Sequence, residues 1–258
     1  MITAASNSRI KRLVSLQRKA KARKEEGVFV AEGTKMFLEA PDERIREVYV
    51  SESFLRDCPC RERLMRTGYE VVEDSLFSRI SDTCTPQGIL CVVKQLRYDI
   101  RQMRETDFWL VLENIQDPGN LGTMLRTAEG AGVGGVIMSR DTADIYNPKV
   151  IRSTMGSVYR VPFLYVGNLE EALRKLAEEG VHLYAAHLQG EHNYTQEDYR
   201  QKTAFLIGNE GNGLREETLR LAQTYIRIPM AGRVESLNAA VAAAILMYEA
   251  AAQRRGRV

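Results

Sequence analysis

The second half of the chain alternates short apolar segments with helical ones, and this pattern constrains the fold more than any other feature. Segments with the length and composition of buried strands lie at residues 108–112, 135–138, 161–166, 181–186, 204–207 and 224–228. Helices are expected at residues 121–131, 169–178, 215–221 and 237–254. This order predicts an α/β domain with a mostly parallel sheet that is covered on both faces. Ligands of such sheets bind beyond the carboxyl ends of the strands. The loops to consider therefore follow Leu112, Ala186, Ile207 and Ile228.

The first half contains a smaller α/β pattern. A helix is expected over residues 7–24, where Ser6 or Asn7 can cap the amino end and Gly27 stops it. Strands are expected at residues 28–31, 47–50, 69–72 and 89–93, with helices near 34–39 and 61–65. Residues 96–107 are charged and lack a sustained apolar pattern, so we expect a linker there. The 258 residues are therefore expected to form two domains, at residues 1–97 and 107–258.

Basic residues gather at the two ends of the chain. Eight basic residues and no acidic one lie between Arg9 and Lys24, and Arg254, Arg255 and Arg257 lie at the other end. The formal net charge is only +2, so the body between these ends is acidic. This asymmetry suggests a polyanionic partner, and a solvated charged helix is the alternative interpretation.

Several classes of protein are excluded. The longest apolar run, residues 239–248, is much shorter than the roughly 20 residues that span a bilayer. No apolar stretch follows the first basic residues, as a signal peptide would require. Four cysteines in a chain of this length do not make a disulfide scaffold. We therefore expect a cytoplasmic protein without a membrane partner.

Neither a metal site nor a dinucleotide site is expected. Cys58 and Cys60 lack a second pair of cysteines at zinc spacing, and the three histidines lie five residues apart across a strand and a loop. Gly130, Gly132 and Gly135 satisfy G-x-G-x-x-G by spacing. They follow a helix and precede a strand, however, which is the reverse of the order that a pyrophosphate site needs.

Two of the remaining loops carry polar residues that turns alone do not explain. In residues 113–126, Asp117 begins a turn and Asn120 is a suitable helix N-cap, but Arg126 lies inside an otherwise apolar helical stretch. Residues 208–214 contain three glycines around Glu210, which lets the backbone approach a ligand closely.

The third loop, residues 226–238, leads from a strand into the last helix. Its Ser236 is either the N-cap of that helix or part of a site.

Together the three loops resemble the SpoU family of SPOUT-class RNA ribose 2′-O-methyltransferases over residues 108–254. The matching motifs are N-x-x-D-P-x-N-x-G-x-x-x-R at 114–126, G-N-E-G-x-G-L at 208–214 and I-P-M-x-G-x-V-x-S-L-N at 228–238. Residues 147–156 resemble the family's connecting region, and residues 28–95 resemble, less sharply, the small α/β RNA-binding domain of many members.

The resemblance implies a deep trefoil knot, formed from about Ala204 to Asn238, that makes the pocket for S-adenosylmethionine. It also implies a homodimer whose active site is near the subunit interface. Chains almost never thread a loop, so general folding rules would not have suggested the knot.

The resemblance further implies residue roles. The family's catalytic positions correspond to Arg126, Asn120, Glu210, Ser236 and Asn238. The cofactor pocket is expected to include Ala186, Leu188, Gly208, Asn209, Gly213, Ile228, Met230 and Leu237. Since arginine is effectively always protonated, we expect Arg126 to bind the target phosphate and to stabilise developing alkoxide charge rather than to act as a base.

The expected substrate is RNA. Phosphate contacts in the basic helix are expected from Arg18, Lys19, Lys21, Arg23 and Lys24. The appended domain favours 23S ribosomal RNA as the target. The alternatives are a transfer-RNA 2′-O-methyltransferase and a non-catalytic RNA-binding or ribosome-assembly factor on the same fold.

Overall fold

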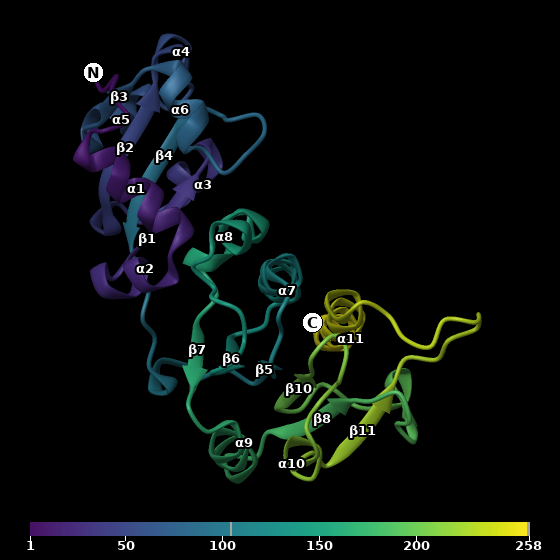
Figure 1. Cartoon of the computed structure of the whole chain (residues 1–258). Coiled ribbons are helices and arrows are strands. Elements are labelled where there is room, and N and C mark those ends of the chain that lie inside the picture. Colours follow the sequence, from purple (N-terminus) through teal and green to yellow (C-terminus); the bar gives the residue numbers. More distant parts are fainter. Residues whose placement is uncertain (104, 257–258) are drawn as a thin grey trace. The chain divides into compact units, whose positions relative to one another are not determined.

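The computed structural model describes residues 1–103 and 105–256, which form two compact units (Figure 1). The first unit consists of Met1–Leu96 and Asp144–Tyr159. The second consists of Arg97–Ala143 and the described residues from Arg160 onward. Arg257, one of the basic residues expected at the carboxyl end, lies outside the described residues. No helix in the described ranges is long and apolar enough to span a bilayer.

A four-stranded sheet forms the centre of the first unit. Its strands are β1 (Val28–Glu32), β2 (Ile45–Ser51), β3 (Glu70–Val72) and β4 (Ile89–Lys94), in the order β1-β4-β2-β3. β4 runs antiparallel to β1 and β2, while β2 and β3 are parallel. The helices are α1 (Ser8–Arg18), α2 (Ala20–Glu26), α3 (Thr34–Glu39), α4 (Glu52–Arg56), α5 (Arg61–Thr67) and α6 (Asp74–Ile80). The sequence predicted all four strands but missed α4 and α6.

The single helix predicted over residues 7–24 is wrong in one respect, because the chain bends between α1 and α2. Lys19 has an extended backbone (φ −117°, ψ 112°) at the junction. Gly27 ends α2 in the left-handed conformation, as expected. The bend lets Arg23 on α2 donate to the carbonyl oxygens of Leu16 and Gln17, at 2.8 and 3.0 Å.

Residues Asp144–Tyr159 were expected in the carboxyl-terminal domain, but they pack with the first unit. This segment contains α8 (Pro148–Thr154), which lies against β1. The ring of Tyr146 stacks on Phe29 with centroids 4.9 Å apart, and its hydroxyl donates to the carbonyl of Leu96. The periodicity of the segment does not reveal which unit covers its apolar face.

The second unit contains a seven-stranded sheet in which every observed pairing is parallel. Its strands are β5 (Phe108–Leu112), β6 (Gly135–Ser139), β7 (Phe163–Val166), β8 (His182–Ala186), β9 (His192–Asn193), β10 (Thr203–Ile207) and β11 (Thr224–Arg227). The order is β7-β6-β5-β10-β8-β11-β9. The α/β domain with a parallel sheet is thus confirmed.

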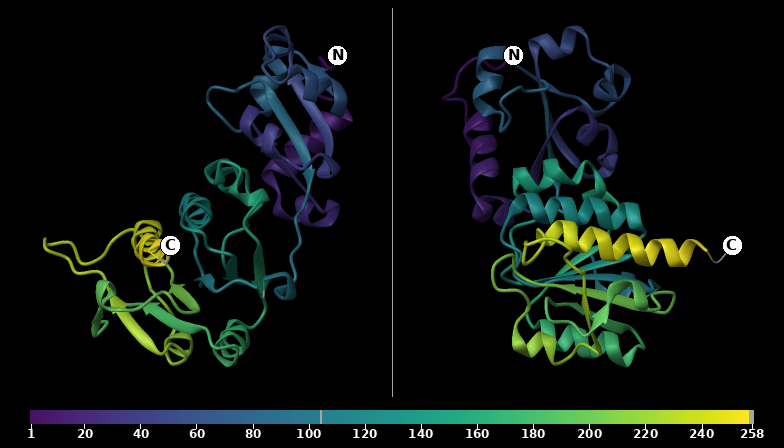
Figure 2. Two further views of the ribbon diagram at one scale, coloured as in Figure 1. Left: turned by 180° about the vertical axis from the view of Figure 1, so that it is seen from behind. Right: turned by 90° about the vertical axis from the view of Figure 1, so that its right-hand side faces the viewer.

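Helices cover both faces of this sheet (Figure 2). They are α7 (Pro118–Ala131), α9 (Leu169–Glu178), α10 (Glu216–Leu219) and α11 (Ala239–Arg255). α7 and α11 pack together on one face, and α9 and α10 lie on the other. Within the predicted linker, Ile100–Met103 form a 3₁₀ turn, and the Met103 side chain is buried.

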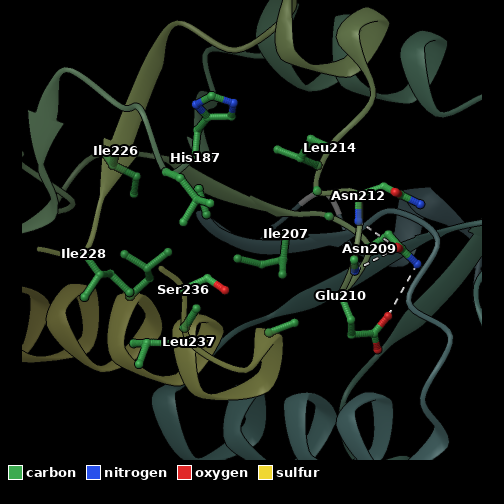
Figure 3. A pocket seen from close by; sticks show the side chains of 18 of the residues that line it. His187, Ile207, Asn209, Glu210, Asn212, Leu214, Ile226, Ile228, Ser236 and Leu237 are labelled. Carbon is green, nitrogen blue, oxygen red and sulfur yellow. Dashed lines mark hydrogen bonds between the residues drawn. The ribbon is translucent and has the colours of Figure 1, made fainter. Parts of the chain in front are cut away.

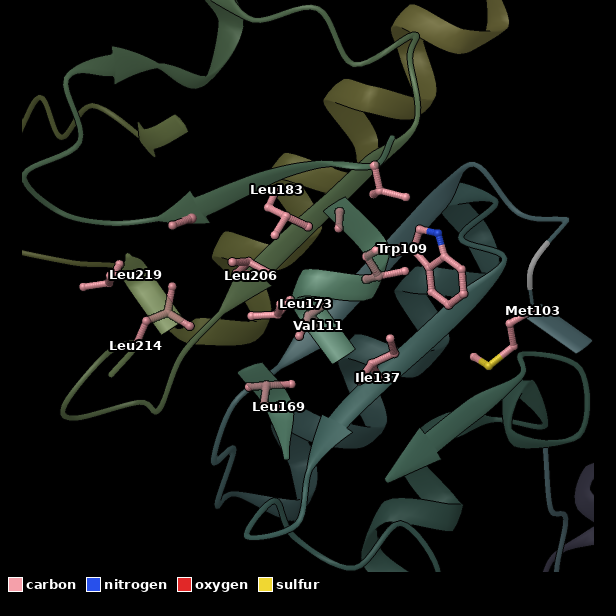
Figure 4. Packing of buried hydrophobic residues seen from close by; sticks show 14 residues of the cluster. Met103, Trp109, Val111, Ile137, Leu169, Leu173, Leu183, Leu206, Leu214 and Leu219 are labelled. Carbon is pink, nitrogen blue, oxygen red and sulfur yellow. The ribbon is translucent and has the colours of Figure 1, made fainter. Parts of the chain in front are cut away.

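The core beneath α9 and α10 explains why the strands are so apolar (Figure 4). Trp109, Val111 and Leu206 on neighbouring strands are almost fully buried there. Leu169, Leu173 and Leu176 recur every three or four residues along α9, so one face of the helix packs on this sheet.

Parallel pairing brings the carboxyl ends of β5, β10, β8 and β11 to one edge of the sheet. All of the predicted site loops begin at this edge, although they come from distant parts of the sequence.

Candidate active site

The glycine-rich segment Gly208–Leu214 folds back on itself directly after β10. Asn209 and Gly213 exchange both backbone hydrogen bonds, at 3.0 and 2.9 Å. A Cβ atom at Gly208 would lie 2.1 Å from the backbone carbon of Gly213, so this position requires glycine. The Asn209 side chain accepts from the amides of Gly211 and Asn212 and therefore stiffens the tip.

This segment forms one wall of a cavity of about 400 Å³ (Figure 3). The other walls come from the loops after β8 and β11 and from the start of α11. All eight residues predicted for the cofactor pocket line it: Ala186, Leu188, Gly208, Asn209, Gly213, Ile228, Met230 and Leu237. Glu210 and Ser236 line it as well.

Ten further lining residues were missed by the sequence analysis: His187, Gln189, Ile207, Gly211, Asn212, Leu214, Ile226, Ala239, Ala242 and Leu246. The first seven lie within two residues of a predicted pocket residue or of Glu210, so their positions near the strand ends could have suggested them. Ala239, Ala242 and Leu246 recur at helical spacing on α11, and only their packing shows that this face is turned toward the cavity.

Three predicted catalytic side chains from the three loops form a hydrogen-bonded chain. Asn120 donates from Nδ2 to Oε1 of Glu210 at 3.0 Å, and Asn238 donates from Nδ2 to Oδ1 of Asn120 at 3.0 Å. The backbone amides of Gln116 and Asp117 each donate to the Glu210 carboxylate at 3.1 Å. Although burial raises the pKa of Glu210, these hydrogen bonds outweigh it and lower the pKa below its ordinary value. Glu210 is therefore held as a carboxylate.

Neither of the two residues that the sequence offered as helix N-caps, Asn120 and Ser236, caps a helix in the structure. Asp117, not Asn120, caps α7, by accepting from the amide of Asn120 at 2.7 Å. Asn238, not Ser236, caps α11, by accepting from the amides of Ala240 and Val241. The side chain of Asn120 is thus free to bridge Glu210 and Asn238, and Ser236 lines the cavity without capping the helix.

Arg126 lies on α7 and is exposed. It does not line the cavity, and within the described ranges it has no hydrogen-bond or ion-pair partner. Its guanidinium is therefore available to a ligand that approaches from solvent.

Asn114 was part of a motif but was not predicted as a site residue. Its φ of +55° places it in the left-handed region, which is uncommon for a residue other than glycine. Its amide donates to the hydroxyl of Ser139, and its carbonyl accepts from Nδ2 of Asn209, both at 2.8 Å. Asn114 thus joins the end of β5 to the glycine-rich segment.

The basic residues predicted to contact RNA differ in exposure. Arg18, Lys19, Lys21 and Lys24 are exposed. Arg23 is only 3% exposed and pairs with Asp144 at 2.6 Å. The prediction for Arg23 is corrected here, since its guanidinium is committed to protein oxygens.

A family model described as the SpoU rRNA methylase family matches residues 107–248. The chain belongs to this family. A second model, described as an MRM3-like substrate binding domain, matches residues 7–91.

Curated relatives within this SpoU family include a protein of Bacillus subtilis strain 168 named 23S rRNA (guanosine(2553)-2′-O)-methyltransferase RlmP. It is 34% identical, with 96% of this chain and 97% of that protein covered. A Bordetella pertussis protein named 23S rRNA (guanosine-2′-O-)-methyltransferase RlmB is 36% identical over 83% of this chain and 91% of its own length.

Solved structures of the SpoU family are also similar. The AdoMet-bound rRNA methyltransferase from Sinorhizobium meliloti superposes with a TM-score of 0.85 at 33% identity, with 100% of this chain and 98% of that chain covered. The SpoU methyltransferase AviRb from Streptomyces viridochromogenes, in complex with AdoMet, gives a TM-score of 0.87 at 27% identity, with 97% and 100% covered.

Proposed function

We propose that this protein transfers a methyl group from S-adenosylmethionine to a ribose 2′-hydroxyl of 23S ribosomal RNA. The observation that carries the proposal is the cavity at the carboxyl edge of the sheet, beside the chain Glu210–Asn120–Asn238. The names of the relatives from Bacillus and Bordetella support both the reaction and the class of RNA.

The lining of the cavity fits S-adenosylmethionine. Ile207, Ile226, Ile228 and Leu237 offer apolar surface to an adenine ring, and the turned backbone around Gly208 offers polar groups to the nucleoside. Among the described lining residues there is no lysine or arginine, and Glu210 is the one carboxylate. A sulfonium cation therefore meets no repulsive charge there. The AdoMet-bound SpoU structures support the same assignment.

When bound, S-adenosylmethionine supplies an electrophilic methyl group on a sulfonium sulfur. Because methyl transfer is an in-line displacement, the protein chiefly positions the two reactants. The carbon–sulfur bond would break as the 2′-oxygen bonds to the methyl carbon, and the hydroxyl proton would pass to solvent. Arg126 binds the phosphate of the target nucleotide and stabilises negative charge as it develops on the 2′-oxygen. Glu210 holds Asn120, and Asn120 and Asn238 fix the start of α7 against the start of α11. Ser236 shapes the cavity wall.

The first unit docks the RNA, and residues 107–258 carry out the transfer. The match of residues 7–91 to a substrate binding domain supports this division of labour. Phosphate contacts that do not depend on the RNA sequence come from four exposed basic side chains, those of Arg18, Lys19, Lys21 and Lys24. The proposal also includes a deep trefoil knot through about Ala204–Asn238. It further includes a homodimer formed through the catalytic domain and a cytoplasmic location.

The test is methyl transfer to a 23S ribosomal RNA transcript from tritium-labelled S-adenosylmethionine. The wild-type protein should label the RNA, and Arg126→Ala should reduce the rate by about 10²–10³-fold while leaving the affinity for the donor unchanged. An Arg126→Ala variant as fast as wild type would remove the role given to this arginine.

A further inference from the structure

Two charged side chains are buried among the residues that the structure describes, those of Arg23 and Glu113. The burial of Arg23 is accounted for, because its guanidinium donates to carbonyl oxygens at the bend between α1 and α2 and pairs with Asp144. Glu113 is 1% exposed and directly follows β5, at the edge of the sheet where the site loops meet. A buried carboxylate is costly unless its oxygens accept hydrogen bonds, so its partners indicate what it does.

Both carboxylate oxygens of Glu113 are bound by residues that follow the glycine-rich segment. Oε2 accepts from the backbone amide of Arg215 at 2.8 Å, and Oε1 accepts from the hydroxyl of Thr218 at 2.7 Å. The guanidinium of Arg215 lies 3.9 Å from Oε1 and also pairs with Asp141. The Glu113 amide donates to the carbonyl of Ile207, which immediately precedes the segment.

The two ends of Gly208–Leu214 are therefore fixed to two consecutive residues. At one end, Asn209 donates to the carbonyl of Asn114, and at the other, Arg215 donates to the carboxylate of Glu113. The segment between them is a tight turn closed by the Asn209–Gly213 pair, so we expect it to move as a unit. We expect a shift at Arg215 to displace both the cavity wall and Glu210.

We propose that Glu113 is a positioning residue for the donor pocket, which it holds in shape by fixing Arg215 and Thr218. The inference rests on the proposed function, because it assigns the pocket to S-adenosylmethionine. Glu113 does not line the cavity and acts through the segment that does.

The test compares Glu113→Ala, Glu113→Gln and Thr218→Val with Val136→Ala. Val136 is buried in the same unit but on β6, outside the core cluster that contains Leu214 and Leu219, so its truncation lowers the melting temperature without removing packing against the segment. The readouts are the dissociation constant of S-adenosylmethionine by calorimetry, at a temperature where every variant is folded, and the separate KM and kcat for the donor.

Glu113→Ala should raise the dissociation constant and the KM for the donor by about tenfold or more, because the Arg215 amide and the buried Thr218 hydroxyl lose their acceptor. Glu113→Gln should stay within about threefold of wild type, since the carboxamide can accept from the Arg215 amide and donate to the Thr218 hydroxyl. The dissociation constant and the KM of Thr218→Val should lie between those of Glu113→Gln and Glu113→Ala. If Glu113→Ala does not fold, Thr218→Val takes its place in the test.

A Glu113→Ala protein, or Thr218→Val in its place, that matches Val136→Ala in both melting temperature and donor affinity would overturn the inference and leave the proposed function intact. A wild-type protein that neither binds S-adenosylmethionine nor methylates RNA would overturn both.

Discussion

Asn120 and Glu210 lie 90 residues apart in the sequence, and their side chains form a hydrogen bond of 3.0 Å. The bond joins the first turn of α7 to the glycine-rich segment after β10. It forms because Asp117 caps α7, which leaves the Asn120 side chain free to donate. The contact ties two of the motif loops into one site.

The lowered pKa of Glu210 predicts how the site responds to acid. Burial raises this pKa, and the bonds from Asn120, Gln116 and Asp117 lower it by more. A carboxyl with a depressed folded-state pKa stabilises the fold above its unfolded value, and this contribution is lost as the pH falls through the folded-state pKa. Wild type should therefore be more stable than Glu210→Gln near pH 7, and the difference should disappear at pH values below the ordinary glutamate range.

Urea unfolding of the two proteins between pH 3 and pH 7 measures this difference. A constant gap across the whole range would show that Glu210 titrates alike in the folded and unfolded chains. Asn120→Ala is the matched control, because it removes only one of the donors to Glu210. In an Asn120→Ala background, the stability difference near pH 7 between proteins with and without Glu210→Gln should be smaller but should not vanish.

Substitutions at Asn114 should separate its backbone conformation from its side chain. Glycine adopts a φ of +55° without strain, so Asn114→Gly should change the free energy of unfolding by less than about 0.5 kcal/mol. Asn114→Ala places a Cβ in the left-handed region and should destabilise by about 1–2 kcal/mol. Chemical denaturation tests both, and equal effects of glycine and alanine would contradict the explanation.

Arg23 and Lys24 are neighbours in sequence with different predicted effects. Arg23→Ala removes one partner of a largely buried ion pair and should lower the free energy of unfolding by about 2–3 kcal/mol. It should leave the salt dependence of RNA binding unchanged. Lys24→Ala should leave stability unchanged and reduce the slope of log K against log salt by about 0.7–0.9, the value for one lost phosphate contact. Filter binding at several salt concentrations distinguishes the two, and a reversed pattern would refute the assignment.

Removal of residues 1–96 should leave the remaining chain prone to self-association. Asp144–Tyr159 would lose Phe29 and the rest of β1, exposing apolar side chains that include Val150, Ile151 and Val158. Size-exclusion chromatography with light scattering should show species larger than a dimer, and polar substitutions at Ile151 and Val158 should reduce them. A truncated protein of uniform size without these substitutions would show that the segment does not depend on the first unit.

The parallel sheet could be predicted because its strands are apolar runs separated by helices with a clear period, such as Leu169–Glu178. The motif loops could be placed together because parallel strands end at one edge. Residue spacing could not show that the first helix breaks at Lys19, because residues 7–24 contain no glycine or proline, and the bend appears only in the extended backbone of Lys19. Spacing could not identify Glu113 either, since its hydrogen-bond partners lie more than 100 residues away in the sequence.

The most direct test of the proposed activity is the chemical position of the transferred methyl group. A 2′-O-methyl group protects the adjacent phosphodiester from alkali, because the neighbouring hydroxyl can no longer attack it, whereas a base methyl group does not. RNA labelled by the wild-type protein with tritiated S-adenosylmethionine should release its label in alkali-resistant dinucleotides. Label found only in mononucleotides, or no label at all, would contradict ribose 2′-O-methylation.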